Sequence, residues 1–372
     1  MRVLLISNTG FQYLAAVIPA MEKLGVVCKT ISAASFSRAI PDYLPRQFRR
    51  YYFDRKMILD LRDAIAAFRP DVVHVTGIRS VLLKVLAAMR PFETVAMVHE
   101  RIAAAGMNMF SPLDPFLFRT RRIDRLIVPS RAMLNNWMGS HYLRWLAPPR
   151  RNEVLHYAFN LPAPTSAEQK RVLQRELGLD PDAFIIGTVC NIRPWKAVEF
   201  VADIVASLDT ARPVIFAVVG GWWSAHAQYI EKIRAAGGER LKLLGHIPQA
   251  ERVMPAFDLY TTPTHLPGES FGMAFAEAMA HGVPGITMNY GASAEVCDHG
   301  YTGYALPESK SVWRRHILEL IENDALRTAM GQAARRRIAE RFSPENRASD
   351  YVRIYQTVIE ERGGWKERRP TA

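Results

Sequence analysis

Residues 269–284 read Glu-Ser-Phe-Gly-Met-Ala-Phe-Ala-Glu-Ala-Met-Ala-His-Gly-Val-Pro and closely follow an apolar run at 259–262. The apolar run predicts a buried strand, and the alanine-rich stretch predicts a helix from about Ser270 or Phe271 to Ala280, with Gly282 as its stop signal. A helix that starts directly after a strand presents free backbone N–H groups and the positive end of its dipole at one edge of the sheet. The unit therefore predicts an anion site suited to a diphosphate.

Two glutamates flank this predicted helix start. Ser270 and Glu277 are seven residues apart and so share a predicted helix face, with Glu269 at its entrance. Gly272 would let a ligand approach the backbone closely. By spacing alone, two glutamates eight residues apart are equally typical of a solvated helix face.

Strand and helix signals alternate in both halves of the chain. This alternation predicts parallel sheets with helices on both faces. We therefore predict an α/β fold with two Rossmann-like domains facing across a cleft, and ligands at the carboxyl ends of the strands. The predicted strands are 3–6, 26–31, 71–75, 95–99, 126–128, 184–189, 214–219, 241–244, 259–262 and 285–288, and the predicted helices include 11–24, 56–68, 79–89 and most of 309–361.

The predicted domain boundary lies in a proline-containing stretch. Residues 161–170 carry two prolines and little apolar content, which is typical of a linker. We expect an N-terminal domain over 1–160, completed by a C-terminal helix over about 345–372, and a C-terminal domain over 171–344.

Composition narrows the classes of partner and compartment. The 372 residues fit two domains, and the net charge of +12 favours an anionic partner such as nucleic acid, an anionic membrane or a phosphorylated substrate. Cys28, Cys190 and Cys297 form no CxxC pair, which argues against a disulfide framework and a structural zinc site. We expect a cytoplasmic protein without a membrane span, at most peripheral on the inner face of the cytoplasmic membrane. The letters Asp180-Pro181-Asp182 are interpreted as a turn, so metal-independent chemistry is expected.

Three stretches in fixed order carry a family resemblance. They are Glu269-x7-Glu277 with Phe271-Gly272 between, then Glu277-Ala278-Met279-Ala280-x-Gly282-x-Pro284, then Gly291-Ala292-Ser293-Ala294-Glu295-Val296. The pattern resembles the signature of family-4 retaining glycosyltransferases, which have the GT-B fold. Residues 218–221, 243–247 and 302–306 extend the likeness in the second half. The first half is the weaker match, as expected if it reads the acceptor.

The resemblance implies a site for the donor sugar and its phosphates. Glu269 would hold hydroxyls of the sugar, and Ser270 with the amides around Phe271, Gly272 and Met273 would hold sugar and phosphate. An ionised carboxylate suits this task because it accepts several hydroxyl donors at once.

The same resemblance assigns the nucleoside. Glu277 would bind the ribose hydroxyls, Gly220 would form the glycine turn after its strand, and His246 and Ile247 would lie at the base. No cofactor is implied, since a UDP- or GDP-sugar would be the substrate.

Two residues of the first half complete the implied site. Gly10 lies in the place of the family's acceptor-side glycine loop. His99 lies at a strand end, where it would approach the sugar C6 region or the reacting centre. A lone histidine at a strand end is also typical of a satisfied structural histidine.

The phosphate loop departs from the family pattern. The family has an arginine and a lysine five residues apart, and here Lys196 matches while Asn191 occupies the arginine position. Arg193 lies two residues further on. A leaving diphosphate needs preorganised cations, so either Arg193 reaches in, or Asn191 and the helix N-termini suffice, or activity is reduced. Arg193 could equally be an exposed loop charge.

Aromatic and basic residues gather in the first half. Residues 41–56 interleave five basic with five aromatic side chains, and Arg119, Arg121, Arg122 and Arg125 form a second cluster. Such segments suit an anionic bilayer surface, which would bring the protein to a lipid-linked acceptor, and they are almost as typical of a solvated basic face. The arginines at 335–337 and 368–369 are interpreted as surface charge or a crossover helix end.

The resemblance implies a retaining sugar transfer from a nucleotide-diphosphate sugar to a glycan or lipid-linked acceptor, in cell-surface polysaccharide or glycolipid synthesis. The donor's own diphosphate oxygen would serve as the base. A GT-B nucleotide-sugar epimerase and a catalytically degenerate assembly subunit stay open as alternatives. A nucleic-acid binder is the third, and no recognition motif supports it.

Overall fold

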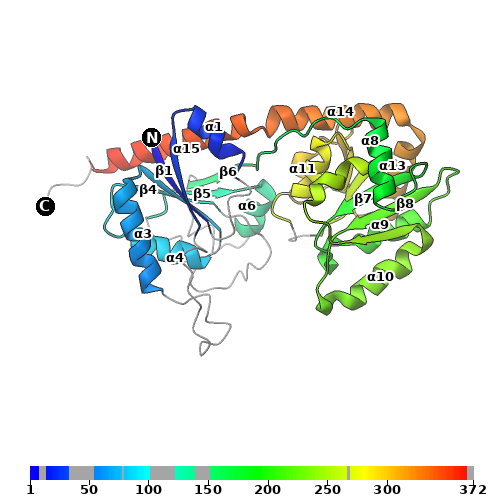
Figure 1. Cartoon of the computed structure of the whole chain (residues 1–372), viewed down its shortest axis with the longest axis horizontal. Helices are drawn as coiled ribbons and strands as arrows, with labels where there is room; N and C mark the ends of the chain where they lie inside the picture. Colours follow the sequence, from blue (N-terminus) through cyan, green and yellow to red (C-terminus); the bar gives the residue numbers. More distant parts are fainter. Residues whose placement is uncertain are drawn as a thin grey trace. The chain divides into compact units, whose positions relative to one another are not determined.

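A computed structural model describes residues 1–7, 14–32, 54–77, 79–100, 122–138, 151–265 and 269–366 (Figure 1). The chain divides into two compact units. Unit 1 comprises Met1–Ala158 and Pro344–Ala372, and unit 2 comprises Phe159–Ser343.

Unit 1 is built on a six-stranded parallel sheet, as the alternation of strand and helix signals predicts. Its strand order is β2-β1-β3-β4-β5-β6. Val3 of β1 lies opposite Cys28 of β2 and Val72 of β3. The last strand was not predicted, because its Asn-Glu-Val sequence carries a single apolar residue. The strands are β1 (Arg2–Ser7), β2 (Val27–Ser32), β3 (Val72–Thr76), β4 (Ala96–Glu100), β5 (Arg125–Val128) and β6 (Asn152–Val154).

Helices cover both faces of this sheet because successive strand residues point to opposite sides. Val3 and Leu5 belong to the core under α1 (Val17–Lys23) and the C-terminal helix α15 (Pro344–Lys366). Leu4 and Ile6 belong to the core under α3 (Arg55–Phe68) and α4 (Arg79–Ala88). A further helix, α6 (Arg131–Met138), follows β5.

Unit 2 is a second six-stranded parallel sheet, with the order β12-β11-β10-β7-β8-β9. From β7 the chain adds β8 and β9 on one side and then returns to place β10 on the other, so the direction of winding reverses between β7 and β10. Ligands of open α/β sheets bind at the carboxyl ends of the strands at such a point. The strands are β7 (Phe184–Val189), β8 (Val214–Val219), β9 (Leu241–Gly245), β10 (Leu259–Thr262), β11 (Gly285–Met288) and β12 (Gly303–Leu306).

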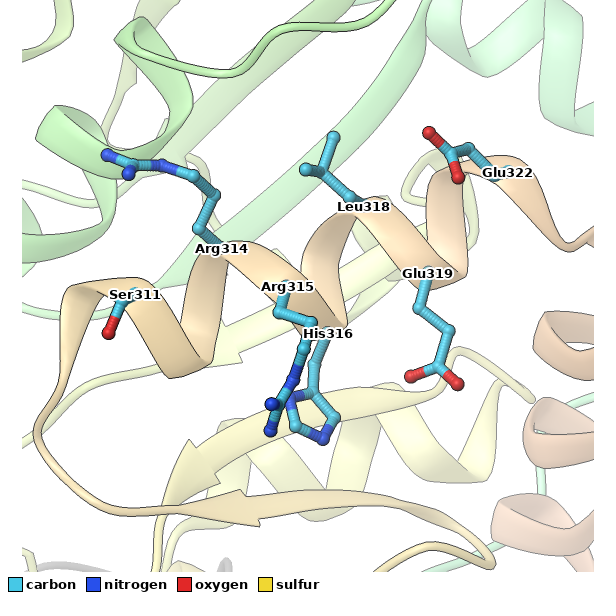
Figure 2. A pocket seen from close by; sticks show the side chains of 7 residues that line it. All are labelled: Ser311, Arg314, Arg315, His316, Leu318, Glu319 and Glu322. Atoms are coloured by element: carbon cyan, nitrogen blue, oxygen red, sulfur yellow. The ribbon is translucent and has the colours of Figure 1, made fainter.

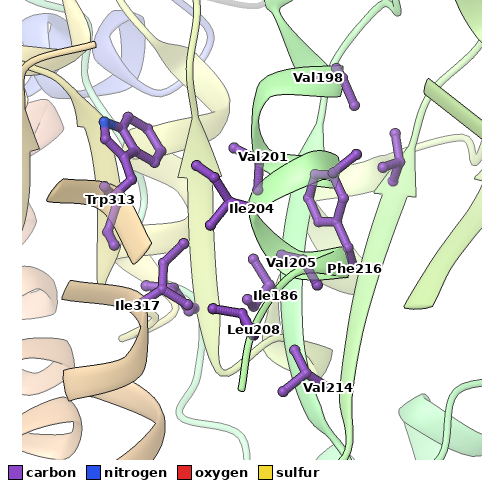
Figure 3. Packing of buried hydrophobic residues seen from close by; sticks show 14 of the residues in the cluster. Ile186, Val198, Val201, Ile204, Val205, Leu208, Val214, Phe216, Trp313 and Ile317 are labelled. Carbon is purple, nitrogen blue, oxygen red and sulfur yellow. The ribbon is translucent and has the colours of Figure 1, made fainter. Parts of the chain in front are cut away.

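One face of the unit 2 sheet packs on α9 (Val198–Ala206), α10 (Ala227–Gly237) and α13 (Lys310–Glu322). Figure 3 shows Ile204, Phe216 and Trp313 interleaved in this core. Burying each side chain of this size stabilises the fold by about 2 kcal/mol. On the other face, Phe275 of α11 (Met273–Ala280) lies against Gly285, and α11 packs on α14 (Asp324–Arg341).

Part of the predicted linker is helical. Residues 161–170 include the start of α8 (Ala167–Glu176), which belongs to unit 2. Ser166 and Gln169 form a capping box, in which each side chain accepts a hydrogen bond from the other's backbone N–H. The crossings between the units lie at residues 158–159 and 343–344, where the Phe159 N–H donates to the Phe342 carbonyl at 2.8 Å.

Candidate functional site

The loop and helix after β10 are shaped by Gly272. This residue caps α11 in the left-handed region, with φ 93° and ψ 48°, and a Cβ there would lie 2.4 Å from Ser293 Oγ. Only glycine adopts this conformation without strain and leaves room for Ser293. The helix therefore begins at Met273, two or three residues later than predicted. Ser270 precedes it, so the helix face predicted for Ser270 and Glu277 is wrong.

The structure brings together Glu269 and Lys196, which are 73 residues apart in sequence. Lys196 Nζ lies 3.3 Å from Glu269 Oε1, with both side chains less than one-fifth exposed. Ser293 donates to Glu269 Oε2 at 3.4 Å. A lysine ammonium has three N–H donors, so Lys196 retains donors for a second anion. Lys196 follows β7 and Glu269 follows β10. These are the two strands between which the direction of winding reverses, which we call the switch point.

A pocket lies beside Glu269 at the carboxyl ends of β10 and β11. Glu308 organises its edge, since one carboxylate oxygen lies 3.2 Å from His265 Nε2 and the other accepts a hydrogen bond of 3.1 Å from Tyr290. Burial, and then the contact with Glu308, raises the pKa of Tyr290 to about 12. Hydroxyls, one imidazole and one carboxylate thus line this small space, and such groups form hydrogen bonds with hydroxyl-bearing ligands. The lining residues are Thr264, His265, Glu269, Thr287, Tyr290, Gly291, Ala292 and Ser293.

The three predicted phosphate-loop residues after β7 have different surroundings. Asn191 is exposed. The guanidinium carbon of Arg193 lies 4.1 Å from the centre of the Trp223 ring and 5.1 Å from that of Trp195. Arg193 therefore stacks on aromatic rings, whereas Lys196 pairs with Glu269.

The ends of β8 and β9 lie against the same loop. A Cβ on Gly220 would lie 1.7 Å from the Cys190 carbonyl oxygen, so glycine is required at this approach. The Gly220 N–H donates to the Gly245 carbonyl at 2.8 Å. Directly after β9, His246 is exposed and Ile247 is partly buried. The predicted base-binding residues thus stand at the same sheet edge as the phosphate loop.

Glu277, which the family resemblance assigns to the ribose as an ionised carboxylate, lies in a largely buried environment. Burial, and then the nearby Glu251, raises its pKa to about 7. Near neutral pH the carboxyl is therefore close to half protonated in the absence of ligand. Its predicted role requires the ionised form, so a ligand would shift this protonation equilibrium.

Phe271 serves the core with its side chain. It is fully buried and its ring stacks on Phe159 at 5.9 Å and meets Phe342 edge-on at 6.0 Å. Its side chain therefore belongs to the core and does not line a ligand site. Met273, the first residue of α11, is partly buried. The amide contacts expected at these two residues stay predictions.

The predicted residues of unit 1 are only partly described. Gly10 lies outside the described residues, as do residues 41–53, Arg119 and Arg121. His99 is buried at the end of β4, and its Nδ1 lies 3.1 Å from the Val75 carbonyl oxygen. A carbonyl only accepts, so Nδ1 carries the hydrogen of this bond.

Glu100, the neighbour of His99, anchors a buried polar network that the sequence analysis did not find. Its carboxylate accepts a hydrogen bond of 2.9 Å from Tyr351 of α15 and lies 3.2 Å from His74 Nε2. His74 Nδ1 in turn contacts the Tyr355 hydroxyl at 2.6 Å. The network joins β3 and β4 to α15.

Two of the predicted basic clusters have structural contacts instead of a free surface. Arg122 donates to the carbonyls of Met89, Phe92 and Val95, and Arg125 forms a bidentate pair with Glu361. In the tail, Arg335 donates to the carbonyls of Ala280 and Pro162, and Arg337 to that of Val296. Arg122 and Arg125 therefore have structural contacts within unit 1, and Arg335 and Arg337 lie near the end of α14, just before the crossing at residues 343–344, as the interpretation of a crossover helix end expects.

A second, open pocket runs along α13 (Figure 2). It carries both charge signs and contains none of the predicted site residues. Its lining residues are Ser311, Arg314, Arg315, His316, Leu318, Glu319 and Glu322.

The described ranges contain neither a membrane-spanning helix nor a metal-ligating cluster. In those residues no helix is both long and apolar enough to cross a membrane. Within the same ranges, three or more His, Cys, Asp or Glu side chains nowhere gather as a metal site would need. All three cysteines are free thiols.

Sequence reasoning missed Ser293 and Trp223 as site residues. Ser293 lies in the stretch 291–296 quoted for the family pattern, and its hydroxyl could have been noted there. Trp223 follows the glycine turn at 220–221, where two adjacent tryptophans at a strand end were a signal.

Comparisons with known proteins match both halves. Residues 169–337 match the family described as glycosyl transferases group 1, and residues 17–161 match the family described as glycosyltransferase family 4. The N-acetyl-alpha-D-glucosaminyl L-malate synthase of Bacillus anthracis is 28% identical over 190 residues, covering 50% of this chain and 49%, about half, of that relative. A D-inositol 3-phosphate glycosyltransferase of Jonesia denitrificans is 25% identical over 355 residues, covering 89% of this chain and 81% of the relative.

A solved structure has the same fold. HepE of Anabaena, in complex with UDP, superposes with a TM-score of 0.73 at 15% identity, covering 96% of this chain and 100% of that chain. At this identity the likeness shows the fold alone.

Proposed function

The chain belongs to the group 1 glycosyltransferases and has their GT-B fold, and from this premise we propose that it transfers a sugar from a nucleotide-diphosphate sugar with retention of anomeric configuration. The proposed acceptor is a glycan or a lipid-linked glycan. HepE has been solved with UDP and with UDP-glucose, so a UDP-sugar is the first donor to test.

The observation that supports the proposal best is the Lys196–Glu269–Ser293 arrangement at the switch point between β7 and β10. The pocket beside Glu269 offers oxygen and nitrogen groups to sugar hydroxyls. In the proposed reaction Lys196, whose Nζ lies 3.3 Å from Glu269 Oε1, would stabilise the negative charge that develops on the leaving diphosphate. A fixed cation at such a point is worth about 100-fold or more in rate.

The departing diphosphate and the incoming hydroxyl would share one face of the sugar. The donor's own phosphate oxygen would take the proton of that hydroxyl, so the chain would supply orientation and charge. Lys196 would stabilise the leaving group, and Glu269 would hold the sugar by its hydroxyls.

The test is turnover of a panel of UDP- and GDP-sugars with glycan and lipid-linked acceptors. Glu269→Gln keeps the shape but loses the charge that pairs with Lys196, and it is expected to lower kcat by about 100-fold. Glu176→Gln, on the exposed end of α8, serves as the matched control. Wild-type kcat in Glu269→Gln would refute the site assignment.

The same assay separates the alternatives. Proton NMR of the product reports whether the anomeric configuration is retained. Consumption of donor without acceptor would favour an epimerase. Binding of donor without turnover, across the whole panel, would favour a degenerate assembly subunit.

A further inference from the structure

Arg193 is held by a compact group of aromatic rings on the surface of unit 2. Its guanidinium carbon lies 4.1 Å from the Trp223 ring centre and 5.1 Å from that of Trp195. His226 stacks on Trp223 at 6.0 Å and 16°, and meets Trp195 edge-on at 6.5 Å. We call Arg193, Trp195, Trp223 and His226 the arginine cluster.

Core packing does not explain this cluster. Trp223 is 63% exposed, although most large aromatic side chains of the unit are buried. An exposed tryptophan gains less hydrophobic stabilisation on folding than a buried one. The Trp223 ring face is in contact with a cation. The Trp223 ring thus contacts two side chains, Arg193 and His226.

The hydrogen-bonding edge of Arg193 remains available. Within the described residues, Arg193 has neither a carboxylate at ion-pair distance nor a hydrogen-bond acceptor for its guanidinium. A guanidinium has five N–H donors in its plane, and ring stacking uses only its face. The cluster thus fixes the plane of a cation without using any of its donors.

The cluster lies at the sheet edge that carries Lys196. Arg193 follows β7 and Trp223 follows the adjacent strand β8. The two loops are joined by a hydrogen bond of 2.9 Å from the Ile192 N–H to the Gly221 carbonyl, and the Lys196 N–H donates to the Arg193 carbonyl at 2.9 Å. Arg193 and Lys196 therefore belong to one short loop, which is tied by its backbone to the loop that carries Trp223.

We propose that Trp223 is a positioning residue that holds Arg193 as the second diphosphate-binding cation beside Lys196. The inference rests on the proposed function, because it assigns the diphosphate of a donor to this loop. Arg193 contacts the anion, and Trp223 acts through Arg193. The two cations would recognise the negative charge of the diphosphate, and inorganic pyrophosphate has this charge without the nucleoside or the sugar.

The test measures binding by calorimetry to the full chain, with inorganic pyrophosphate, UDP and uridine as probes. Arg193→Ala is expected to weaken pyrophosphate and UDP binding by about 30-fold, the range of one charged hydrogen-bonding group. Trp223→Ala is expected to weaken both by about fivefold, the range of one exposed cation–π contact. Uridine, which lacks phosphate, should bind all variants equally.

A double-mutant cycle separates positioning from direct contact. Trp223→Ala should have no further effect in the Arg193→Ala background, and Trp223→Phe should restore binding because a phenyl ring also stacks on a guanidinium. Trp222→Ala is the matched control, since Trp222 is the adjacent residue, is 40% exposed, and has no ring contact with Arg193 among the described residues.

Each result decides the proposal. Equal effects of Trp223→Ala in both backgrounds, or loss of uridine binding, would show direct contact of Trp223 with ligand and overturn it. The proposal would also be overturned if the wild type did not bind pyrophosphate, or if Arg193→Ala bound pyrophosphate as tightly as the wild type. If pyrophosphate binding follows the cycle while no nucleotide binds, the proposed function fails and the cation pair stands.

Discussion

Glu277 is expected to make the stability of unit 2 depend on pH, and Glu277→Gln should remove that dependence. Burial, and then Glu251, raises the pKa of this carboxyl from the ordinary value of 4.5 to about 7. Between these values the folded state keeps the proton while the unfolded state has lost it, so the free energy of unfolding falls as the pH rises. Above the folded pKa both states are ionised and the stability from the retained proton has been lost.

The magnitude follows from the two pKa values. From about pH 5.5 to about pH 7.5, the free energy of unfolding of the wild type should fall by about 2 kcal/mol relative to Glu277→Gln. Urea unfolding of both proteins across this range gives the difference, in which all other titrations cancel. Glu176→Gln, which removes an exposed carboxylate, should show no such trend. A constant difference between wild type and Glu277→Gln would refute the reasoning.

The same carboxyl should couple nucleotide binding to pH. If Glu277 accepts ribose hydroxyls in its ionised form, then UDP affinity of the wild type should rise with pH up to about 7 and then level off. Calorimetry in buffers of different ionisation enthalpy should record proton release on binding below that pH. The Glu277→Gln variant should bind more weakly, with no pH dependence from this position.

Two further substitutions test the packing that supports the site and unit 1. Gly272→Ala should destabilise unit 2 by about 2 kcal/mol or more in thermal unfolding, since it combines a left-handed backbone with a clash on Ser293; Gly300→Ala, with φ 80° and open space, should show only the backbone cost. Tyr351→Phe should lower the stability of unit 1 by about 1–3 kcal/mol, since it removes the hydroxyl that donates to the buried carboxylate of Glu100; an unchanged melting temperature would contradict this account.

Five of the six strands of unit 2 could be predicted closely from the sequence, and β12 was not predicted. The bounds predicted for β7, β8, β10 and β11 agree with the structure to the residue. Each is a short apolar run, and Pro213 and Pro284 mark the starts of β8 and β11. Such runs are buried on both faces in a parallel sheet, so their apolar limits coincide with the strand limits.

Helix starts were less predictable because they depend on single residues. Ser166 and Gln169 form a capping box that lies inside the proline-containing stretch taken as linker. Gly272 delays the start of α11 because its left-handed conformation precedes the helix. The capping residues and Gly272 are visible in the sequence, but the prediction of the helix starts followed the local composition instead.

The sequence predicted which residue types belong to the site, but it did not predict how buried they are or which side chains they contact. The family pattern placed Glu269 and Lys196 in one site, and the structure pairs them at 3.3 Å. The raised pKa of Glu277 depends on burial by the surrounding packing and then on the charge of Glu251, which no spacing rule reports. The stacking of Arg193 on Trp223 joins loops after two different strands, so it appears only once the sheet order is known.

The division of the chain between the units has a consequence for its synthesis. Unit 1 needs α15, because Ala348, Tyr351 and Tyr355 fill the core beneath β1 and β3. Residues 1–158 therefore leave the ribosome before α15, which shares with α1 the covering of one face of their sheet, while unit 2 is continuous in sequence and is the first to have all its parts. A message that stops before residue 344 would yield a whole unit 2 attached to an unfinished unit 1 with exposed apolar surface.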